Sequence, residues 1–400
     1  MKIAQRATKI APSLTLELTA KAKKLKEEGK DVVSFGAGEP DFNTPEYICN
    51  AAKEALDNGV TKYTPASGTV ALKNTVCNKF KLDNGLEYAP SNIVISNGAK
   101  HSLHNAISAV VEEGDEVIIP APYWLTYPEL VGLAGGKSVF VETKAENGFK
   151  MTAEELECAI TDKTVAIILN NPNNPTGAVY TEEEIKALAK VIEDKDVWVI
   201  SDEIYEVLNY TDAPVYSIAK YSDALKEKTI IVNGVSKTYA MTGWRIGFIA
   251  APVAVAKAIA NMQSHTTSNP NSIAQYATVA AYEDKEGEAF LKEMKESFDR
   301  RRKLIMSKLD EVKQISYVTP LGAFYVMINV ENVLGKSTSA GKKIDTPLCF
   351  ANALLDEKEV VAIPCEAFGA PTYLRLSYAI SDADIIKGVE RIGEFVASLS

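Results

Sequence analysis

The chain has few cysteines and no long apolar run, which argues against a disulfide-rich protein and against a membrane-spanning one. Only five of its 400 residues are cysteine, an odd number without a CxxC pair, so we expect no disulfide framework, zinc site or other bound metal. No stretch approaches the roughly 18 apolar residues of a membrane-spanning helix, and the first residues lack the apolar core of a signal peptide. A basic excess is also missing: 43 Lys and Arg stand against 53 Asp and Glu, a net charge of −10, which argues against nucleic acid or an anionic membrane as a partner. We therefore expect a cytoplasmic protein.

What the chain does contain is the composition of a folded globular protein, with 46% hydrophobic and 24% charged residues. Its length favours two or three domains. Seven short apolar runs, several of them apolar on both faces of a strand, are separated by turn residues and helical patterns, which predicts a mostly parallel seven-stranded sheet in an α/β fold. The runs are Ile93–Ser96, Val117–Ile119, Val139–Val141, Val165–Leu169, Val197–Ile200, Thr229–Val232 and Ile246–Ile249.

The end of the chain follows another pattern. A long amphipathic helix begins near Glu288, two short strands are predicted at Ala323–Asn329 and Leu374–Tyr378, and a last helix covers Ala383–Ser398. Strands and helices without regular alternation indicate a smaller α+β domain. We expect an N-terminal segment that begins the small domain (1–45), a large domain (46–285) and a small C-terminal domain (286–400). Residues 334–346 have the composition of an exposed loop.

Polar residues follow five of the predicted strands. Because ligands of an open α/β sheet bind beyond the carboxyl ends of its strands, these segments are the candidate site. They offer backbone donors at a helix start, an indole, amides, a carboxylate near a phenol, and a lysine. Together these groups suit a phosphorylated aromatic aldehyde. The segments are Asn97–Lys100, Pro120–Trp124, Asn170–Gly177, Ser201–Tyr205 and Asn233–Lys237.

Taken singly, each of these residues also has an ordinary structural explanation. Gly98 suits a turn before a helix, and Trp124 suits a packed core. Asp202 suits a helix cap, and an isolated Lys237 would be a solvated lysine. Only the combination points to chemistry.

The combination resembles a known family. The stretch Gly234–Gly247 fits the pyridoxal-phosphate attachment pattern of class I (fold-type I) aminotransferases, and Asn173–Gly177, Ser201–Tyr205 and Ala37–Phe42 match further motifs in the same order. The resemblance covers nearly the whole chain and is greatest to the bacterial aspartate aminotransferases. It implies the fold of pyridoxal-phosphate-dependent transferases and pyridoxal 5′-phosphate as the cofactor.

The resemblance also implies roles for the cofactor site. Lys237 would form a Schiff base with the cofactor and later carry the substrate proton. Asp202 would face the ring nitrogen and keep it protonated. Tyr205 and Asn174 would bind the 3′ oxygen, and Trp124 would stack on the ring. The expected phosphate contacts are Gly98, Ala99, Lys100, Arg245 and, from the neighbouring subunit of a homodimer with shared sites, Tyr63. Ser236 is also expected to contact the cofactor.

For the substrate, the resemblance implies that Arg375 binds the α-carboxylate as a two-pronged donor. Gly38, Trp124 and Asn174 would also contact the substrate, and the N-terminal segment would move to close the site. The distal carboxylate needs a second cation, for which we expect Lys100, helped by Ser13 and Thr15. The expected pair is L-aspartate and 2-oxoglutarate.

Other functions on the same scaffold remain open. An aromatic, alanine or prephenate aminotransferase, or a C–S lyase, would need the same cofactor residues. A regulatory protein that had kept only the fold would be expected to have lost Lys237, Asp202 or Arg375. Cys365 and Glu366 stand where many relatives have Gly-Ser, and the 334–346 loop is longer than in many of them.

Overall fold

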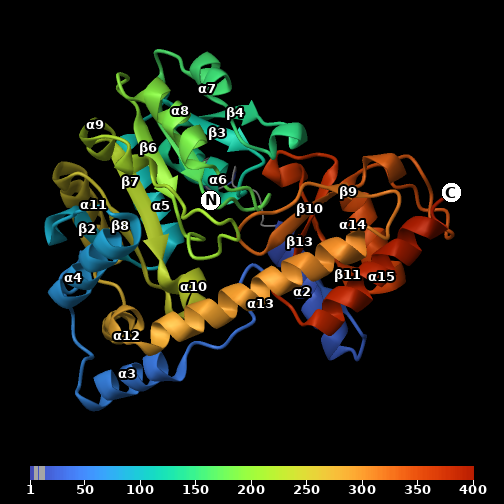
Figure 1. Ribbon diagram of the computed structural model, residues 1–400, viewed down its shortest axis with the longest axis horizontal. Helices are drawn as coiled ribbons and strands as arrows, with labels where there is room; N and C mark the ends of the chain where they lie inside the picture. Colours follow the sequence, from blue (N-terminus) through green and yellow to red (C-terminus); the bar gives the residue numbers. More distant parts are fainter. Residues whose placement is uncertain (4–7, 9–13) are drawn as a thin grey trace.

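The computed structural model describes residues 1–3, 8 and 14–400. Its largest sheet has seven strands in the order β2-β8-β7-β6-β5-β3-β4. β8 is antiparallel to both of its neighbours, and every other pair in this sheet is parallel. The predicted α/β fold with a mostly parallel seven-stranded sheet is confirmed (Figure 1). The strands are β2 (Ile93–Ser96), β3 (Glu116–Ala121), β4 (Lys137–Glu142), β5 (Thr164–Asn170), β6 (Trp198–Asp202), β7 (Thr229–Gly234) and β8 (Gly247–Ala250).

Helices cover both faces of this sheet, which explains why its strands are apolar on both sides. Ile168 and Ile200 point to one face, where they pack with α5 (Ala99–Val110), α6 (Thr126–Ala134) and α11 (Val253–Thr266). Their neighbours Ile167 and Val199 point to the other face and pack with α7 (Ala153–Ala159) and α8 (Glu182–Ile192). On that side, α3 (Glu46–Asp57), α4 (Val70–Lys79) and α12 (Ser272–Glu283) cover the β2 and β8 end.

The start of α8 shows how closely local sequence sets a boundary. Thr181 precedes the helix, and its hydroxyl accepts a hydrogen bond from the Glu184 amide at 3.2 Å. In return the Glu184 carboxylate accepts from the Thr181 amide at 2.8 Å. This reciprocal cap, predicted from the Thr-Glu-Glu-Glu sequence, satisfies two amides that the helix itself cannot.

Two smaller sheets and the remaining long helices form the rest of the described chain. An antiparallel sheet has the order β12-β13-β10-β9, and β1 pairs in parallel with β11. The 24-residue helix α13 runs from beside α12 to α15 (Figure 1). Across the described residues, no helix combines the length and apolar character needed to cross a membrane. The elements are α2 (Leu14–Glu27), β1 (Val33–Ser34), α13 (Glu286–Leu309), β9 (Ser316–Tyr317), β10 (Tyr325–Asn329), α14 (Pro347–Lys358), β11 (Val360–Val361), β12 (Ile363–Pro364), β13 (Tyr373–Ser377) and α15 (Asp382–Ser398).

The 334–346 segment is more ordered than its composition predicts. Gly335 and Ile344 pair through the backbone, as do Ser337 and Ser400. The Ile344 side chain is fully buried. The expectation of a simple exposed loop was therefore wrong at this residue, because this apolar side chain near the end of the loop belongs to the buried cluster that also holds Phe350 and Phe395.

Candidate active site

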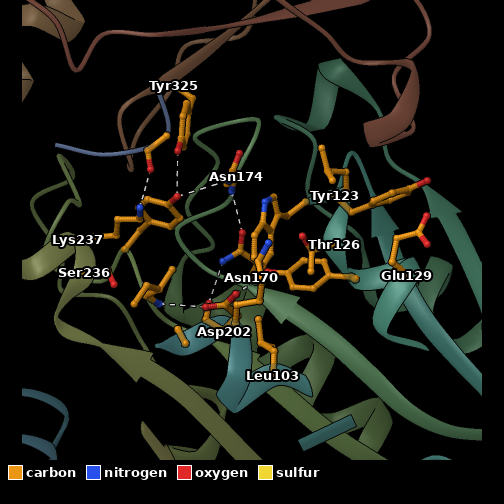
Figure 2. A pocket seen from close by; sticks show the side chains of 18 of the residues that line it. Leu103, Tyr123, Thr126, Glu129, Asn170, Asn174, Asp202, Ser236, Lys237 and Tyr325 are labelled. Atoms are coloured by element: carbon orange, nitrogen blue, oxygen red, sulfur yellow. Dashed lines mark hydrogen bonds between the residues drawn. The ribbon is translucent and has the colours of Figure 1, made fainter. Parts of the chain in front are cut away.

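The loops that follow the parallel strands meet around one cavity of about 650 Å³. Figure 2 shows this cavity with side chains that come from β5, β6, α10 (Val235–Thr238) and the loop before α6. Among the predicted cofactor and substrate residues that the structure describes with their side chains, all except Gly98 and Tyr63 line it. The residues on its wall are Gly38, Ala99, Lys100, Trp124, Asn174, Asp202, Tyr205, Ser236, Lys237, Arg245 and Arg375.

Lys237 projects into the cavity from the short helix α10. Its Nζ donates a hydrogen bond to the Gly38 carbonyl at 2.6 Å. Burial, with a further contribution from the Arg245 and Arg375 charges, lowers the pKa of Lys237 to about 8, although Glu39 and Asp202 act in the opposite direction. About a tenth of this amine is therefore uncharged at pH 7, far more than for a lysine with its ordinary pKa, and the uncharged form is a capable nucleophile and base.

Asp202 ends β6 and is 3% exposed. Burial raises the pKa of this carboxyl to about 6, while hydrogen bonds from Tyr127 and Ile204 and the Lys237 charge act to lower it. The Tyr127 hydroxyl donates to Asp202 Oδ2 at 2.7 Å, and the Ile204 amide donates to Oδ1 at 3.3 Å. A carboxylate with this pKa is mostly ionised at neutral pH, so the cavity holds a fixed anion.

A second cluster joins the Asn174 loop to β13. Arg375 Nη1 donates to Asn174 Oδ1 at 3.0 Å, and the guanidinium lies 4.4 Å from the centre of the Tyr325 ring. The Tyr205 and Tyr325 hydroxyls are 3.1 Å apart, and Asn174 Nδ2 is 3.5 Å from the Tyr205 hydroxyl. Arg375 Nε is buried without a hydrogen-bond partner among the described residues. Since buried donors are nearly always paired, this guanidinium has spare capacity for an anion.

The start of α5 forms an anion cradle with Arg245. Arg245 donates to the Thr242 and Asn97 carbonyls at 2.9 and 3.3 Å, which holds it against the helix start. Gly98 lies behind it with a φ of +85°, and a Cβ there would be 2.4 Å from Arg245 Nη2. Backbone amides of a helix N-terminus next to a guanidinium suit a phosphate group.

Lys100 and Trp124 form the neighbouring wall. Lys100 Nζ lies 4.8 Å from the centre of the Trp124 ring. Burial and the Arg245 charge lower the pKa of Lys100. Of the two residues expected to assist it, Ser13 lies outside the described residues, and Thr15 lies in α2.

Tyr63, another predicted cofactor contact, does not line this cavity. Its side chain is 91% exposed. A role at the phosphate of a neighbouring subunit therefore stays a prediction.

Sequence reasoning missed three residues that line the cavity or contact its polar groups: Asn170, Tyr127 and Tyr325. Asn170 Nδ2 donates to the Asp202 carbonyl, and its Oδ1 accepts from the Asn174 amide. Asn170 directly follows the predicted run Val165–Leu169 and opens the candidate segment Asn170–Gly177, but the sequence assigned it no role of its own. The two tyrosines stand in apolar surroundings in the sequence, where they are typical of a core.

Comparison with known proteins identifies the family. The sequence profile described as "Aminotransferase class I and II" matches residues 30–392. The chain belongs to this family of aminotransferases. The aminotransferase is 49% identical to an aspartate aminotransferase of Bacillus subtilis, over 99% of both chains. It is 45% identical to an aspartate/prephenate aminotransferase of Cereibacter sphaeroides, over 98% of both chains.

Solved structures are similar to this aminotransferase over their full length. An aspartate aminotransferase from Rhizobium meliloti has a TM-score of 0.96 and 42% identity, covering 100% of both chains. One from Thermus thermophilus, described with maleate, has a TM-score of 0.93 and 39% identity, over 99% of this chain and 100% of the other. The resemblance inferred from the motifs is confirmed.

Proposed function

We propose that this aminotransferase moves the amino group between L-aspartate and 2-oxoglutarate, using pyridoxal 5′-phosphate in the described cavity. The observation that carries the substrate proposal is the pair of cations, Arg375 and Lys100, on the wall of the cavity that also holds the Lys237 amine. A dicarboxylate with an amino group between its two anionic ends matches this arrangement. The similar proteins from Bacillus subtilis and Thermus thermophilus are aspartate aminotransferases, which supports the same substrate.

The residues present fit the proposed cofactor. The cradle of Ala99, Ser236 and Arg245 suits its phosphate, and a glycine at position 98 leaves room for the Arg245 guanidinium. Asp202 supplies an anion for the ring nitrogen, and the Trp124 indole supplies a flat apolar surface. When bound, pyridoxal phosphate supplies an aldehyde that links to amines and a ring that withdraws electrons from the substrate Cα.

The chain's own residues then have separate tasks. Arg375 binds the α-carboxylate through its guanidinium, and Lys100 binds the distal carboxylate through its ammonium. Lys237 Nζ, when uncharged, would take the proton from the substrate Cα, hold it as an ammonium and deliver it to the cofactor carbon that carries the transferred nitrogen. The Asp202 carboxylate would keep the ring nitrogen of the bound cofactor protonated. Tyr205 and Asn174 position the reacting groups through hydrogen bonds to the phenolic oxygen of the cofactor.

We also propose a homodimer with shared sites, in which Tyr63 contacts the phosphate bound by the other subunit. Tyr63 lies in a stretch of the sequence, 56–70, that also exposes the apolar side chains of Leu56 (52%) and Val70 (67%). Exposed apolar groups gathered in one region are typical of a protein interface.

An absorbance experiment tests the proposed function. Purified protein is saturated with pyridoxal phosphate, and spectra are recorded before and after L-aspartate, without any keto acid. We expect the band of the bound aldehyde to be replaced by that of the amine form, and 2-oxoglutarate to restore it. A cofactor band that does not respond to aspartate would refute the substrate, and no band at all would refute the cofactor.

A second candidate substrate is prephenate, because some relatives are named aspartate/prephenate aminotransferases. The amino product of prephenate, aromatic amino acids and alanine are tested in the same spectral assay. A C–S lyase would instead release pyruvate from a β-substituted amino acid without needing a keto acid. The ratio of kcat/KM values for aspartate and these compounds separates the candidates.

Removal of the proposed distal cation gives a sharper test of the dicarboxylate. Lys100→Ala should raise the KM for aspartate roughly tenfold or more, the cost of one hydrogen bond to a charged group, and spare an apolar amino acid. Lys292→Ala, which changes a lysine that is 77% exposed on α13, is the matched control. Equal losses for both substrates would contradict the role of Lys100.

A further inference from the structure

Tyr127 is the strongest hydrogen-bond donor to the Asp202 carboxylate among the described residues. It is the second residue of α6 and is 2% exposed. Its hydroxyl lies 2.7 Å from Asp202 Oδ2, whereas the Ile204 amide lies 3.3 Å from Oδ1. Short contacts between a hydroxyl and a carboxylate are stronger than hydrogen bonds between neutral groups.

The direction of this hydrogen bond is fixed by chemistry. An ionised carboxylate can only accept, so the phenol must donate. Burial and the Asp202 charge both raise the pKa of Tyr127 well above its ordinary value, and the phenol therefore keeps its proton over the whole physiological range. Tyr127 is a permanent donor.

The position of the phenol is also fixed. The Tyr127 ring packs edge-on against Trp124, with centroids 5.6 Å apart and an interplanar angle of 86°. Its backbone amide donates to the Trp124 carbonyl at 3.0 Å. Leu130 and Val131, one turn further along α6, pack in the same apolar cluster. The donor is thus held by the same short segment that carries the Trp124 indole.

We propose that Tyr127 is a positioning residue that acts through Asp202, holding the carboxylate as an anion so that the proton of the pair stays on the ring nitrogen of the bound cofactor. This inference rests on the proposed function. The nitrogen and Asp202 share one proton, which lies either on the nitrogen, as an ion pair, or on the carboxyl, as a neutral pair. A donor to Asp202 stabilises the ion pair more than the neutral pair, because its hydrogen bond to a charged carboxylate is the stronger one. The protonated ring is the form that withdraws electrons, so Tyr127 favours the reactive form without touching the substrate.

The test measures the protonation of that nitrogen directly. Apoprotein is loaded with pyridoxal phosphate labelled with ¹⁵N in the ring, and the ¹⁵N chemical shift is recorded for the wild type and for Tyr127→Phe. We expect the wild-type shift of a protonated nitrogen and, in the variant, a move toward the unprotonated value. The kcat for aspartate should fall roughly 10- to 100-fold, as for loss of one hydrogen bond to a charged group, while its KM changes little. An unchanged ¹⁵N shift in a folded Tyr127→Phe would overturn the inference.

Two controls separate this role from a loss of packing. Tyr180→Phe removes another fully buried phenol, which accepts from the Met151 amide outside the cavity, and it should lower the melting temperature without moving the ¹⁵N shift. In an Asp202→Asn background, where no carboxylate remains to accept its hydrogen bond, Tyr127→Phe should cause no further loss of kcat for aspartate. An equal loss in both backgrounds would show that Tyr127 does not act through Asp202.

If Tyr127→Phe does not fold, the same ¹⁵N measurement is made with 3-fluorotyrosine at position 127. This replacement keeps the hydroxyl and makes it a stronger acid. A stronger donor should keep the nitrogen protonated as in the wild type or more so, and a shift toward the unprotonated value would overturn the inference. Failure of the proposed function has a different signature, because the wild type itself would then not bind pyridoxal phosphate.

Discussion

Replacing Lys237 with methionine should make the apoprotein more stable near neutral pH, although it removes the proposed catalytic amine. The reason is that keeping the Lys237 amine charged in the folded site lowers the free energy of unfolding. Burial, together with Arg245 and Arg375, lowers the pKa of Lys237 from its ordinary 10.5 to about 8. In the unfolded chain the amine is solvated and keeps its ordinary pKa.

The size and sign of this cost follow from proton linkage. Between pH 8 and 10.5 the unfolded chain binds a proton at Lys237 that the folded chain does not, so stability rises with pH in this window. Below pH 8 both states are protonated and the full cost is present. A pKa lowered by this amount corresponds to at most about 3 kcal/mol. Lys237 is only partly buried on the wall of an open cavity, so we expect about 1–3 kcal/mol after solvent screening.

Urea unfolding of apoprotein between pH 7 and pH 10 measures this effect. The difference in stability between Lys237→Met and the wild type should be largest at pH 7 and should shrink as the pH rises through 8 to 10. Methionine also changes the packing, but that contribution does not depend on pH. Lys292→Met, on the exposed side of α13, should leave the pH profile unchanged. A difference that is the same at every pH would refute the reasoning.

Two further predictions concern the anion cradle at the start of α5 and the buried ion pair between Lys79 and Glu206. Gly98→Ala should weaken pyridoxal phosphate binding at least roughly tenfold, as for one lost hydrogen bond to a charged group, because the new Cβ would lie 2.4 Å from Arg245 Nη2 at a φ of +85°; fluorescence titration of the apoprotein measures it, and unchanged affinity would show that the cradle does not hold the phosphate. Lys79→Met should cost about 3–5 kcal/mol in urea unfolding, because it leaves the Glu206 carboxylate buried without its cation. The control Lys81→Met breaks an ion pair in which both partners are mostly exposed and should cost less than about 1 kcal/mol, so similar losses for the two variants would contradict the difference in burial.

The sequence predicted the sheet well because its strands are apolar on both faces, and it predicted the cavity because the carboxyl ends of parallel strands meet at one edge. It could not predict that β8 runs antiparallel, since a short apolar run carries no direction. The importance of Tyr127 and Tyr325 was also hidden, because a tyrosine in an apolar segment has the same pattern whether its hydroxyl faces a core or a site. The burial of Ile344 depends on a cluster of residues distant in the sequence, such as Phe298 and Phe395, which local composition does not show.

The positive charges that line the cavity have two effects in the proposed reaction: they attract the anionic substrate and phosphate, and they change the proton affinity of Lys237. The chain carries a net charge of −10, yet Lys100, Arg245 and Arg375 are gathered on one cavity wall with Lys237. These cations attract a doubly negative substrate and a phosphate, and Arg245 and Arg375 also help to lower the pKa of Lys237. When the anions bind, they offset that positive charge, and the proton affinity of Lys237 rises. The amine is therefore best suited to accept a proton at the moment when a substrate Cα has one to give.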